Sequence, residues 1–490
     1  MILEEVDRND DKNHRRSLGV HLTSKEIFKK YILPEIRGKL DKYLWVDLYA
    51  GEGNLILPIL DEIPANERIN FFENHIFLFD VQPEMVEKCR SNTVSYGIPL
   101  EIAKNNITIR DNLNSFPVFL KNKMLPIFHI TNPPYLYLGY IRKHEETKIH
   151  LKHFEGKNKG YQDLYQIAMI NDLRNNVENI IYIIPTNFIF GAAVSNKFRK
   201  DFLKYYNILK MYIFETKIFE FTGTNICISF FRMKKMPKTE EQEFKGLKFK
   251  NKDKKLERRY HLIPRYKYRG GSEFNKFVQE NIAPSPLKVI YYIQRDEIQK
   301  NSGGLPVKVI DTSNYISNDY QRIELKVNNA YHKRITSNIL YVRTVDTGTY
   351  EGRAGLGIIR EDFDVEGVYV SGNTYRTSPI HIILEPEISK DDQILLKDYF
   401  NFILEFFRKK LDSEFLTTYK YSKAEYTRKY LGLTQVREII ETFPILSLNN
   451  EKKEKIKKMI INKDFDAIFT FLTNKKVNTT LKPNDITSWI

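Results

Sequence analysis

The chain has 490 residues, 42% of them hydrophobic and 13% aromatic, which indicates a folded protein large enough for two domains. Its formal net charge of +15 favours a polyanionic partner or an acidic surface, although charge alone does not separate DNA, RNA and membranes. Two cysteines, Cys89 and Cys227, are too few for a disulfide framework or a cysteine zinc site and fit a reducing cytoplasm. The N-terminus is too charged for a signal peptide, and the most apolar stretch, 180–194, contains a proline and is too short to cross a bilayer.

Residues from about 40 to 232 alternate between short apolar runs and helical segments. The runs KYLWVDLYA, HIFLFDV, ITIRD, LPIFHITN, NIIYIIPTN and ICISFFRM are typical of strands, and EMVEKCRSN, DLYQIAMINDLRNN and NKFRKDFLKYY are typical of helices. This alternation predicts an α/β domain at 1–235 with a mostly parallel sheet covered on both faces. No long helix separates the last two apolar runs, which predicts an antiparallel strand or hairpin at the end of the sheet.

The composition changes at 236–270, where lysine and arginine are interleaved with aromatic residues. Between 245 and 269 there are 11 basic residues and two acidic ones. This pattern fits a solvated linker and a DNA-facing arm equally well. Residues 271–490 are strand-rich first and helical from about 390, which predicts a second domain of mixed α+β structure.

Polar residues follow four successive predicted strands of the first domain. Asp47 is followed by a turn with Gly51 and Gly53, Asp80 and Asp111 end the next two strands, and Asn132-Pro133-Pro134-Tyr135 ends the fourth. The carboxyl ends of parallel strands meet at one edge of a sheet, so these residues should share one site. The glycine turn lacks the lysine of a phosphate-binding loop, and two prolines hold Asn132 and Tyr135 rigidly at the mouth of the fourth strand.

This order of motifs resembles the S-adenosylmethionine-dependent amino-methyltransferases, and most closely the N6-adenine DNA methyltransferases. SLGVHLTS (17–24) is similar to their first cofactor motif, and its position before the glycine turn is the order of the γ class. The resemblance covers residues 14–232 and implies a Rossmann-like catalytic domain with S-adenosylmethionine as cofactor. It departs from the family at Glu52, where a small residue is usual, at Asn112, where an aromatic is common, and in the long spacing from Asp47 to Asp80.

The resemblance also implies the role of each motif residue. Thr23, Asp47, Gly51 and Gly53 would line the methionine end of the cofactor, Asp80 would bind its ribose, and Asp111 would bind its adenine amine. Asn132 and the Pro133 carbonyl would accept hydrogen bonds from the target amine, Tyr135 would stack on the flipped target base, and Phe219 or Phe221 would cover the opposite face. An activated sulfonium methyl needs no covalent enzyme intermediate, so the lack of a plausible cysteine nucleophile is expected.

The histidine-rich stretch HEETKIHLKH (144–153) has no zinc-ligand spacing, and we expect no metal. Its lysine-rich surroundings predict an exposed loop in which Lys143, Lys148 and Lys152 could touch a DNA backbone. In the second half, 441–459 resembles the closing segment of target-recognition domains. The loop residues Arg343, Arg353, Tyr375 and Arg376 are candidate DNA contacts, although loop arginines are also ordinary surface residues.

Together these features predict an adenine-N6 methyltransferase acting on double-stranded DNA, with a cognate restriction endonuclease as a possible partner. Alternatives are an RNA adenine or protein glutamine N-methyltransferase, an N4-cytosine methyltransferase, and a DNA-binding specificity subunit without catalysis.

Overall fold

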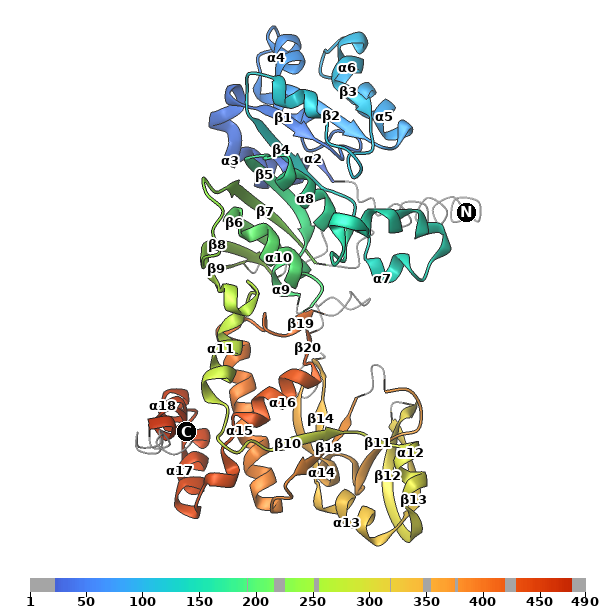
Figure 1. The fold of residues 1–490 in the computed structure, drawn as a ribbon, viewed down its shortest axis with the longest axis vertical. Coiled ribbons are helices and arrows are strands. Elements are labelled where there is room, and N and C mark those ends of the chain that lie inside the picture. The colour runs from blue at the N-terminus through green and yellow to red at the C-terminus, as the bar shows by residue number, and fades with distance from the viewer. Residues whose placement is uncertain are drawn as a thin grey trace, which may run out of the picture. The chain divides into compact units, whose positions relative to one another are not determined.

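A computed structural model describes residues 23–191, 193–215, 225–250, 255–317, 319–346, 354–374, 378–418 and 429–477. The chain forms two compact units (Figure 1). The first comprises residues 1–270 with 420–426, and the second comprises 271–419 with 427–490. No helix among the described residues is long and apolar enough to span a membrane.

The first unit is built on a nine-stranded sheet with the order β3-β2-β1-β4-β5-β7-β6-β8-β9. Its strands are β1 (Leu44–Asp47), β2 (Ile76–Asp80), β3 (Ile107–Ile109), β4 (Ile127–Thr131), β5 (Asn179–Pro185), β6 (Tyr206–Phe214), β7 (Ile226–Met233), β8 (Gln242–Phe249) and β9 (Lys255–Leu262). Strands β1 to β5 pair in parallel, while β7 is antiparallel to both β5 and β6. The predicted α/β class and the antiparallel end of the sheet are thus confirmed.

Short helices connect the strands of this sheet. They are α2 (Lys25–Ile27), α3 (Leu33–Ile36), α4 (Arg68–His75), α5 (Pro83–Val94), α6 (Leu100–Asn106), α7 (Leu138–Ile141), α8 (Leu164–Arg174), α9 (Asn187–Phe190) and α10 (Asn196–Leu203), with a π-helical turn η1 (Phe28–Ile32) and the 3₁₀ segments η2 (Arg37–Lys42), η3 (Leu57–Glu62), η4 (Val118–Asn122), η5 (Glu145–Phe154), η6 (Gly156–Asn158) and η7 (Pro264–Tyr266). Helices α4, α5 and α6 pack on β1, β2 and β3 (Figure 1). The long spacing between Asp47 and Asp80 is taken up by η3 and α4, so both acids still end neighbouring strands.

The basic stretch 236–270 differs from the expected linker or arm, because it forms β8 and β9 at the edge of the same sheet. Its aromatic residues Phe244, Phe249 and Tyr260 are buried, and Phe244 stacks on Tyr260 with ring centroids 5.1 Å apart. On the outer face the basic side chains are paired with acids: Lys245 lies 3.5 Å from Glu257, and Arg259 lies 2.5 Å from Glu243. The high density of charge obscured this strand pattern in the sequence. The alternation of buried and exposed residues with a period of two is the stronger structural signal.

The second unit has a mixed α+β structure, as predicted. Its described strands form the sheets β10-β18-β14-β16, β11-β17-β12-β13 and β15-β20-β19. The strands are β10 (Lys288–Tyr291), β11 (Ile293–Gln294), β12 (Ser302–Ile316), β13 (Asp319–Val327), β14 (Leu340–Arg343), β15 (Val345–Asp346), β16 (Gly355–Ile358), β17 (Gly367–Val370), β18 (Ile380–Glu385), β19 (Thr417–Thr418) and β20 (Lys429–Tyr430). The helices are α11 (Ser272–Asn281), α12 (Arg295–Lys300), α13 (Asn329–Ser337), α14 (Ile359–Phe363), α15 (Lys390–Leu411), α16 (Leu433–Glu441), α17 (Asn450–Ile461) and α18 (Phe465–Val477), with a 3₁₀ turn η8 (Ile445–Ser447).

Helix α15 organises the core of this second unit. The Ser389 side chain caps it by accepting a hydrogen bond from the Asp392 backbone N–H at 3.1 Å. Its apolar face includes Leu396, Tyr399 and Phe400, which are fully buried in one cluster with residues of β14 and β18. This helix therefore provides the scaffold on which the neighbouring strands and loops of the unit are held.

Candidate active site

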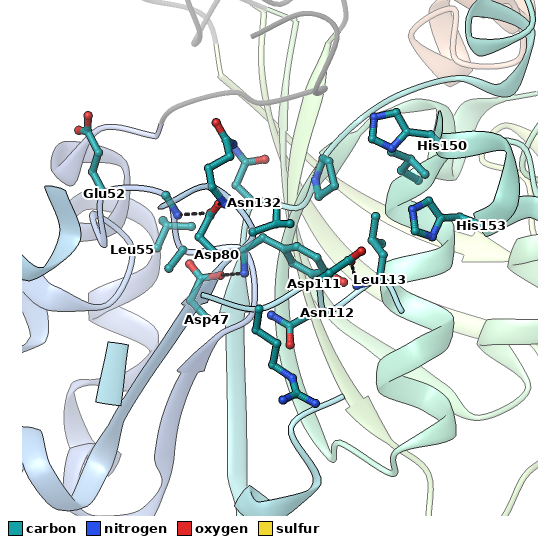
Figure 2. Close-up of a pocket in the computed structure, with 18 of the residues that line it drawn as sticks. Asp47, Glu52, Leu55, Asp80, Asp111, Asn112, Leu113, Asn132, His150 and His153 are labelled. Atoms are coloured by element: carbon teal, nitrogen blue, oxygen red, sulfur yellow. Dashed lines mark hydrogen bonds between the residues drawn. The ribbon is translucent and has the colours of Figure 1, made fainter. Parts of the chain in front are cut away.

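A cavity opens at the carboxyl ends of the parallel strands (Figure 2). It lies where the strand order reverses, between β1 and β4, which is where open α/β sheets bind their ligands. Most of the predicted cofactor and catalytic residues line it: Thr23, Asp47, Gly51, Asp80, Asp111, Asn132 and Pro134. The structure therefore brings together polar residues that the sequence spreads over more than a hundred positions.

Asp47 ends β1 and is buried, with only 1% of its surface exposed. Its Oδ1 accepts hydrogen bonds from the Thr131 hydroxyl at 2.6 Å and from the Tyr49 backbone N–H at 2.9 Å. Burial raises the pKa of Asp47 to about 7, against these hydrogen bonds and nearby His129, which lower it. A carboxyl group in this state favours a positively charged ligand group, which would compensate for its desolvation.

Asp80, at the end of β2, holds the glycine turn in place. It accepts hydrogen bonds from the Gly51 N–H at 2.8 Å and the Gln82 N–H at 2.9 Å. Burial raises the pKa of Asp80, and these backbone hydrogen bonds partly counteract the increase. Gly51 lies at the cavity wall and has a positive φ of 52°. In this conformation its N–H points at the Asp80 carboxylate and not into solvent.

Gly53 does not line the cavity, contrary to its predicted role. Its φ is +82°, and a Cβ atom there would lie 2.6 Å from Leu57 Cδ1 and 2.8 Å from Cys89 Sγ. The glycine is therefore required by the close packing of the turn on η3 and α5, because any side chain would collide with these groups.

The loop after β3 contributes Asp111 and Asn112. Asp111 accepts from the Leu113 N–H at 3.1 Å and from Asn114 Nδ2 at 2.5 Å. Asn112 is only 2% exposed, and its Nδ2 donates to the Leu48 carbonyl at 2.7 Å, which ties this loop to the end of β1. Its Oδ1 is buried and has no hydrogen-bond partner among the described residues.

The Asn-Pro-Pro-Tyr motif directly follows β4. Asn132 Nδ2 donates to Thr23 Oγ1 at 2.9 Å, and Asn132 Oδ1 accepts from the Tyr135 hydroxyl. The same hydroxyl lies 2.7 Å from the Ile183 carbonyl of β5. Tyr135 is 8% exposed and does not line the cavity, so the ring predicted to stack on a target base is packed in the core in this structure.

A buried histidine that sequence reasoning missed lies directly beneath the site. His129 on β4 accepts a hydrogen bond from the Leu48 N–H at Nε2 over 3.2 Å, and its Nδ1 lies 2.6 Å from Asp172 Oδ2 of α8. Tyr182 of β5 donates to the same Asp172 oxygen at 2.7 Å. These contacts imply that Nδ1 carries the proton, and they fix the chain directly after Asp47. The only signal in the sequence was a histidine inside an apolar strand.

The segment η5 forms a further wall of the cavity through Ile149, His150, Lys152 and His153. Figure 2 shows the two histidines across the cavity from Glu52 and Leu55. His153 is 6% exposed, and burial lowers its pKa, although Asp111 acts in the opposite direction. The expectation of an exposed loop is therefore wrong for His153. No cluster of metal-ligand side chains occurs within the described ranges.

Several candidates are not in this cavity. Pro133 precedes the lining residue Pro134 and is not itself part of the wall, and Arg343, at the end of β14 in the second unit, donates to the Tyr341 hydroxyl at 3.3 Å. The base-covering candidates Phe219 and Phe221, the loop candidates Arg353, Tyr375 and Arg376, and residues 17–22 of the first cofactor motif lie outside the described residues. Of the lysines predicted to touch a DNA backbone, Lys148 pairs with Glu145 and Lys152 lines the cavity.

Comparison with known proteins places these features in a family. The model of the N-6 DNA methylase family matches residues 12–308. The type IIL restriction-modification enzyme MmeI, solved in complex with DNA, has a similar fold, with a TM-score of 0.52 and 13% identity over 96% of this chain and 72% of that one. The modification subunit of a putative type I restriction enzyme from Vibrio vulnificus YJ016 matches with a TM-score of 0.36 and 14% identity over 52% of each chain.

The chain thus spans about half the length of that subunit, and it spans 61% of the type IIG restriction endonuclease BpuSI, which matches with a TM-score of 0.41 and 10% identity over 90% of this chain. No curated protein sequence matches. Because the family model covers more than half of the sequence and includes every strand end that contributes to the cavity, the chain belongs to the N-6 DNA methylase family.

Proposed function

We propose that this protein transfers the methyl group of S-adenosylmethionine to N6 of adenine in double-stranded DNA, as the modification component of a restriction-modification system. The observation that carries the proposal is the position of Asn132. It lines the same cavity as Asp47, Asp80 and Asp111, which supports one shared site for a target amine and a cofactor. Membership of the N-6 DNA methylase family supports adenine as the target.

The residues of the cavity fit the cofactor. Asp47 is a buried acid suited to the amino group of the methionine part, and Asp80 at the end of β2 is suited to the ribose hydroxyls. Asp111 is an acceptor suited to the adenine amine. The bound cofactor would supply an activated sulfonium methyl group.

The chain's own contribution is to align and polarise the target amine. Asn132 Oδ1 and the Pro133 carbonyl would accept hydrogen bonds from the amine, which favours a pyramidal nitrogen with an available lone pair. A reaction through a cysteine nucleophile is not supported. Cys89 and Cys227 are buried, and burial raises the pKa of Cys227 to about 12. This environment argues against cytosine-C5 chemistry, which proceeds through a thiolate.

The further assignments extend this proposal to the rest of the chain. Residues 1–235, together with β8 and β9 of the same sheet, would be the catalytic domain and 271–490 the target-recognition domain, with Arg343, Arg353, Tyr375 and Arg376 as candidate DNA contacts. Phe219 or Phe221 would cover the target base, and Tyr135 would have to leave its buried position to stack on it. A cognate endonuclease acting on the same site in the cytoplasm would be the functional partner.

The test is transfer of labelled methyl from S-adenosylmethionine to unmethylated duplex DNA, followed by base-resolved sequencing. We expect N6-methyladenine at one short motif, with loss of about 10²–10³-fold or more in Asn132→Ala, because an oriented acceptor is removed. Asn66→Ala, which changes an exposed asparagine before α4, is the matched control and should keep full activity.

Each other outcome identifies a different function. Label on RNA or protein but not on DNA would contradict the proposal in favour of those amines. N4-methylcytosine would keep the mechanism and change the base. Absence of both methyl transfer and cofactor binding would indicate a specificity subunit without catalysis.

A further inference from the structure

The segment 138–160 connects the Asn-Pro-Pro-Tyr motif to α8 and contains α7, η5 and η6 (Figure 1). Hydrogen bonds hold this segment in one conformation. The hydroxyl of the buried Thr147 donates to the His144 carbonyl at 2.7 Å, and Arg174 of α8 donates to Asn158 Oδ1 at 2.7 Å. The backbone of the 138–160 segment is therefore fixed beside the cavity.

One part of the 138–160 segment reaches the mouth of the cavity. Ile149 and Lys152 both line the cavity and are both exposed, with 66% of the Ile149 surface accessible. Asn132, the proposed acceptor for the target amine, lines the same cavity. A base that enters the cavity brings its own sugar and phosphate to the mouth, because it remains attached to its strand. Lys152 therefore lies where the target strand has to pass.

The 138–160 segment carries positive charge that its own acids do not neutralise. Two of its acids have partners, because Lys148 pairs with Glu145 and His144 Nδ1 lies 3.6 Å from Glu146. Five further exposed cations of the segment have no ion-pair partner among the residues that the structure describes: Arg142, Lys143, Lys152, Lys157 and Lys159. Their charge is available to a partner outside the chain.

The basic stretch 236–270 shows the opposite arrangement. There Lys245 lies 3.5 Å from Glu257, and Arg259 pairs with Glu243. Cations that already face a carboxylate contribute less to the binding of a polyanion, because the acid repels the incoming phosphate. Of these two basic regions of the first unit, the one beside the cavity therefore suits a polyanion better.

We propose that the 138–160 segment binds the sugar-phosphate backbone of the target DNA strand, with Lys152 at the phosphate of the target nucleotide and the other cations at neighbouring phosphates. This inference rests on the proposed function and adds a DNA contact on the catalytic unit, whereas the candidate Arg343 lies in the second unit. Phosphate contacts position a duplex without reading its sequence, so this segment supplies affinity and places the target base.

The first experiment compares two variants of the full chain that lose the same charge. Lys143→Gln/Lys157→Gln removes exposed cations of the segment that do not line the cavity. The control, Lys42→Gln/Lys123→Gln, removes exposed lysines just before β1 and β4, at the opposite edge of the sheet. Binding of an unmodified DNA duplex of about 40 base pairs is measured by fluorescence anisotropy between about 50 and 200 mM salt.

The salt dependence of binding separates the two variants. The slope of log K against log salt should become shallower by about 2 in Lys143→Gln/Lys157→Gln, because two phosphate contacts are lost, and by less than about 0.5 in the control. Equal slopes in the two variants would overturn the inference. Tighter binding of an RNA duplex than of the DNA duplex by the wild type would also overturn it.

The second experiment tests Lys152 with Lys152→Gln and with Lys152→Arg, which keeps the charge. On duplex DNA that contains the methylated motif, kcat/KM of Lys152→Gln should fall roughly 10- to 100-fold, and Lys152→Arg should restore most of it. Calorimetry with S-adenosylhomocysteine should give both variants the wild-type affinity within about twofold. A larger loss in Lys152→Gln would assign this lysine to the cofactor and overturn its role at the DNA.

The two experiments also separate this inference from the proposed function. A wild type that binds S-adenosylhomocysteine but methylates no DNA would contradict the proposed function. The salt dependence of duplex binding does not require methyl transfer, so it would still decide whether the 138–160 segment contacts DNA. A wild type that binds no duplex DNA would contradict both.

Discussion

Asp47 should reduce the stability of the free protein at neutral and alkaline pH, and Asp47→Asn should remove this penalty. The carboxyl group is 1% exposed, and burial raises its pKa from 3.8 to about 7. The native state therefore holds a proton that the unfolded chain releases between these two values. Stability falls as pH rises through this window, and the loss is complete above about pH 7.

The size of the effect follows from the shift. One pKa unit corresponds to about 1.4 kcal/mol, so the rise costs the native state roughly 4 kcal/mol above pH 7 and about 1.5 kcal/mol at pH 5. Asparagine has nearly the same shape and does not ionise, and its oxygen can still accept from Thr131 and from the Tyr49 N–H. The stability of Asp47→Asn relative to wild type should therefore be roughly 3 kcal/mol more favourable at pH 8 than at pH 5.

Urea unfolding of both proteins at pH 5 and pH 8, without cofactor, measures this difference. Asp41→Asn changes an exposed aspartate just before β1 and should show no such pH dependence. The same Asp47→Asn protein should bind S-adenosylhomocysteine more weakly, because it lacks the charge that we propose pairs with the amino group. A difference between Asp47→Asn and wild type that is equal at both pH values would refute the reasoning, since it would mean that burial does not control this carboxyl group.

Three further changes test the surroundings of the cavity. Gly53→Ala should destabilise the protein by about 1–3 kcal/mol more than Gly97→Ala in chemical denaturation, since both glycines have positive φ but only Gly53 lacks space for a Cβ; equal losses would contradict the packing argument. His129→Leu should cost about 3–5 kcal/mol in the same assay, because it leaves the buried Asp172 carboxyl group with only the Tyr182 hydroxyl and the Leu48 N–H without its acceptor. A loss below about 1 kcal/mol would show that these contacts are not needed. His153→Ala should weaken S-adenosylhomocysteine binding about tenfold in calorimetry, because it removes a buried side chain from the wall of the cavity. The control is His144→Ala, which changes a histidine of the same segment that does not line the cavity and should leave the affinity unchanged. Equal affinities of the two variants would exclude His153 from the site.

The sequence was sufficient to predict the sheet and the edge at which the cavity lies. A strand that ends in Asp47 or Asp80 is recognisable from its apolar run alone, and parallel strands bring their carboxyl ends together whatever connects them. The prediction that both acids end neighbouring strands was therefore correct despite the long connection between them, because η3 and α4 fold outside the sheet.

Individual contacts could not be predicted in the same way. Gly53 and Gly51 belong to one turn and look equivalent in the sequence, yet one packs against Leu57 and Cys89 and the other faces the cavity. His153 looked exposed because its sequence neighbours are charged, although the 3₁₀ geometry of η5 turns it inward. Both outcomes depend on which residues from distant parts of the chain occupy the space nearby, and no local pattern contains that information.

The difference between topology and individual contacts explains why the family can be identified before the role of each residue has been tested. The order of strand ends is a property of topology. It does not change when one side chain is replaced, as at Asn112, where an aromatic residue is common in the family, because the backbone still reaches the cavity. The role of a side chain depends on its partners: Asn112 is buried and ties its loop to the Leu48 carbonyl by a hydrogen bond. Where a chain departs from its family at a cavity wall, a change in how the ligand is held is therefore expected before a change in the reaction.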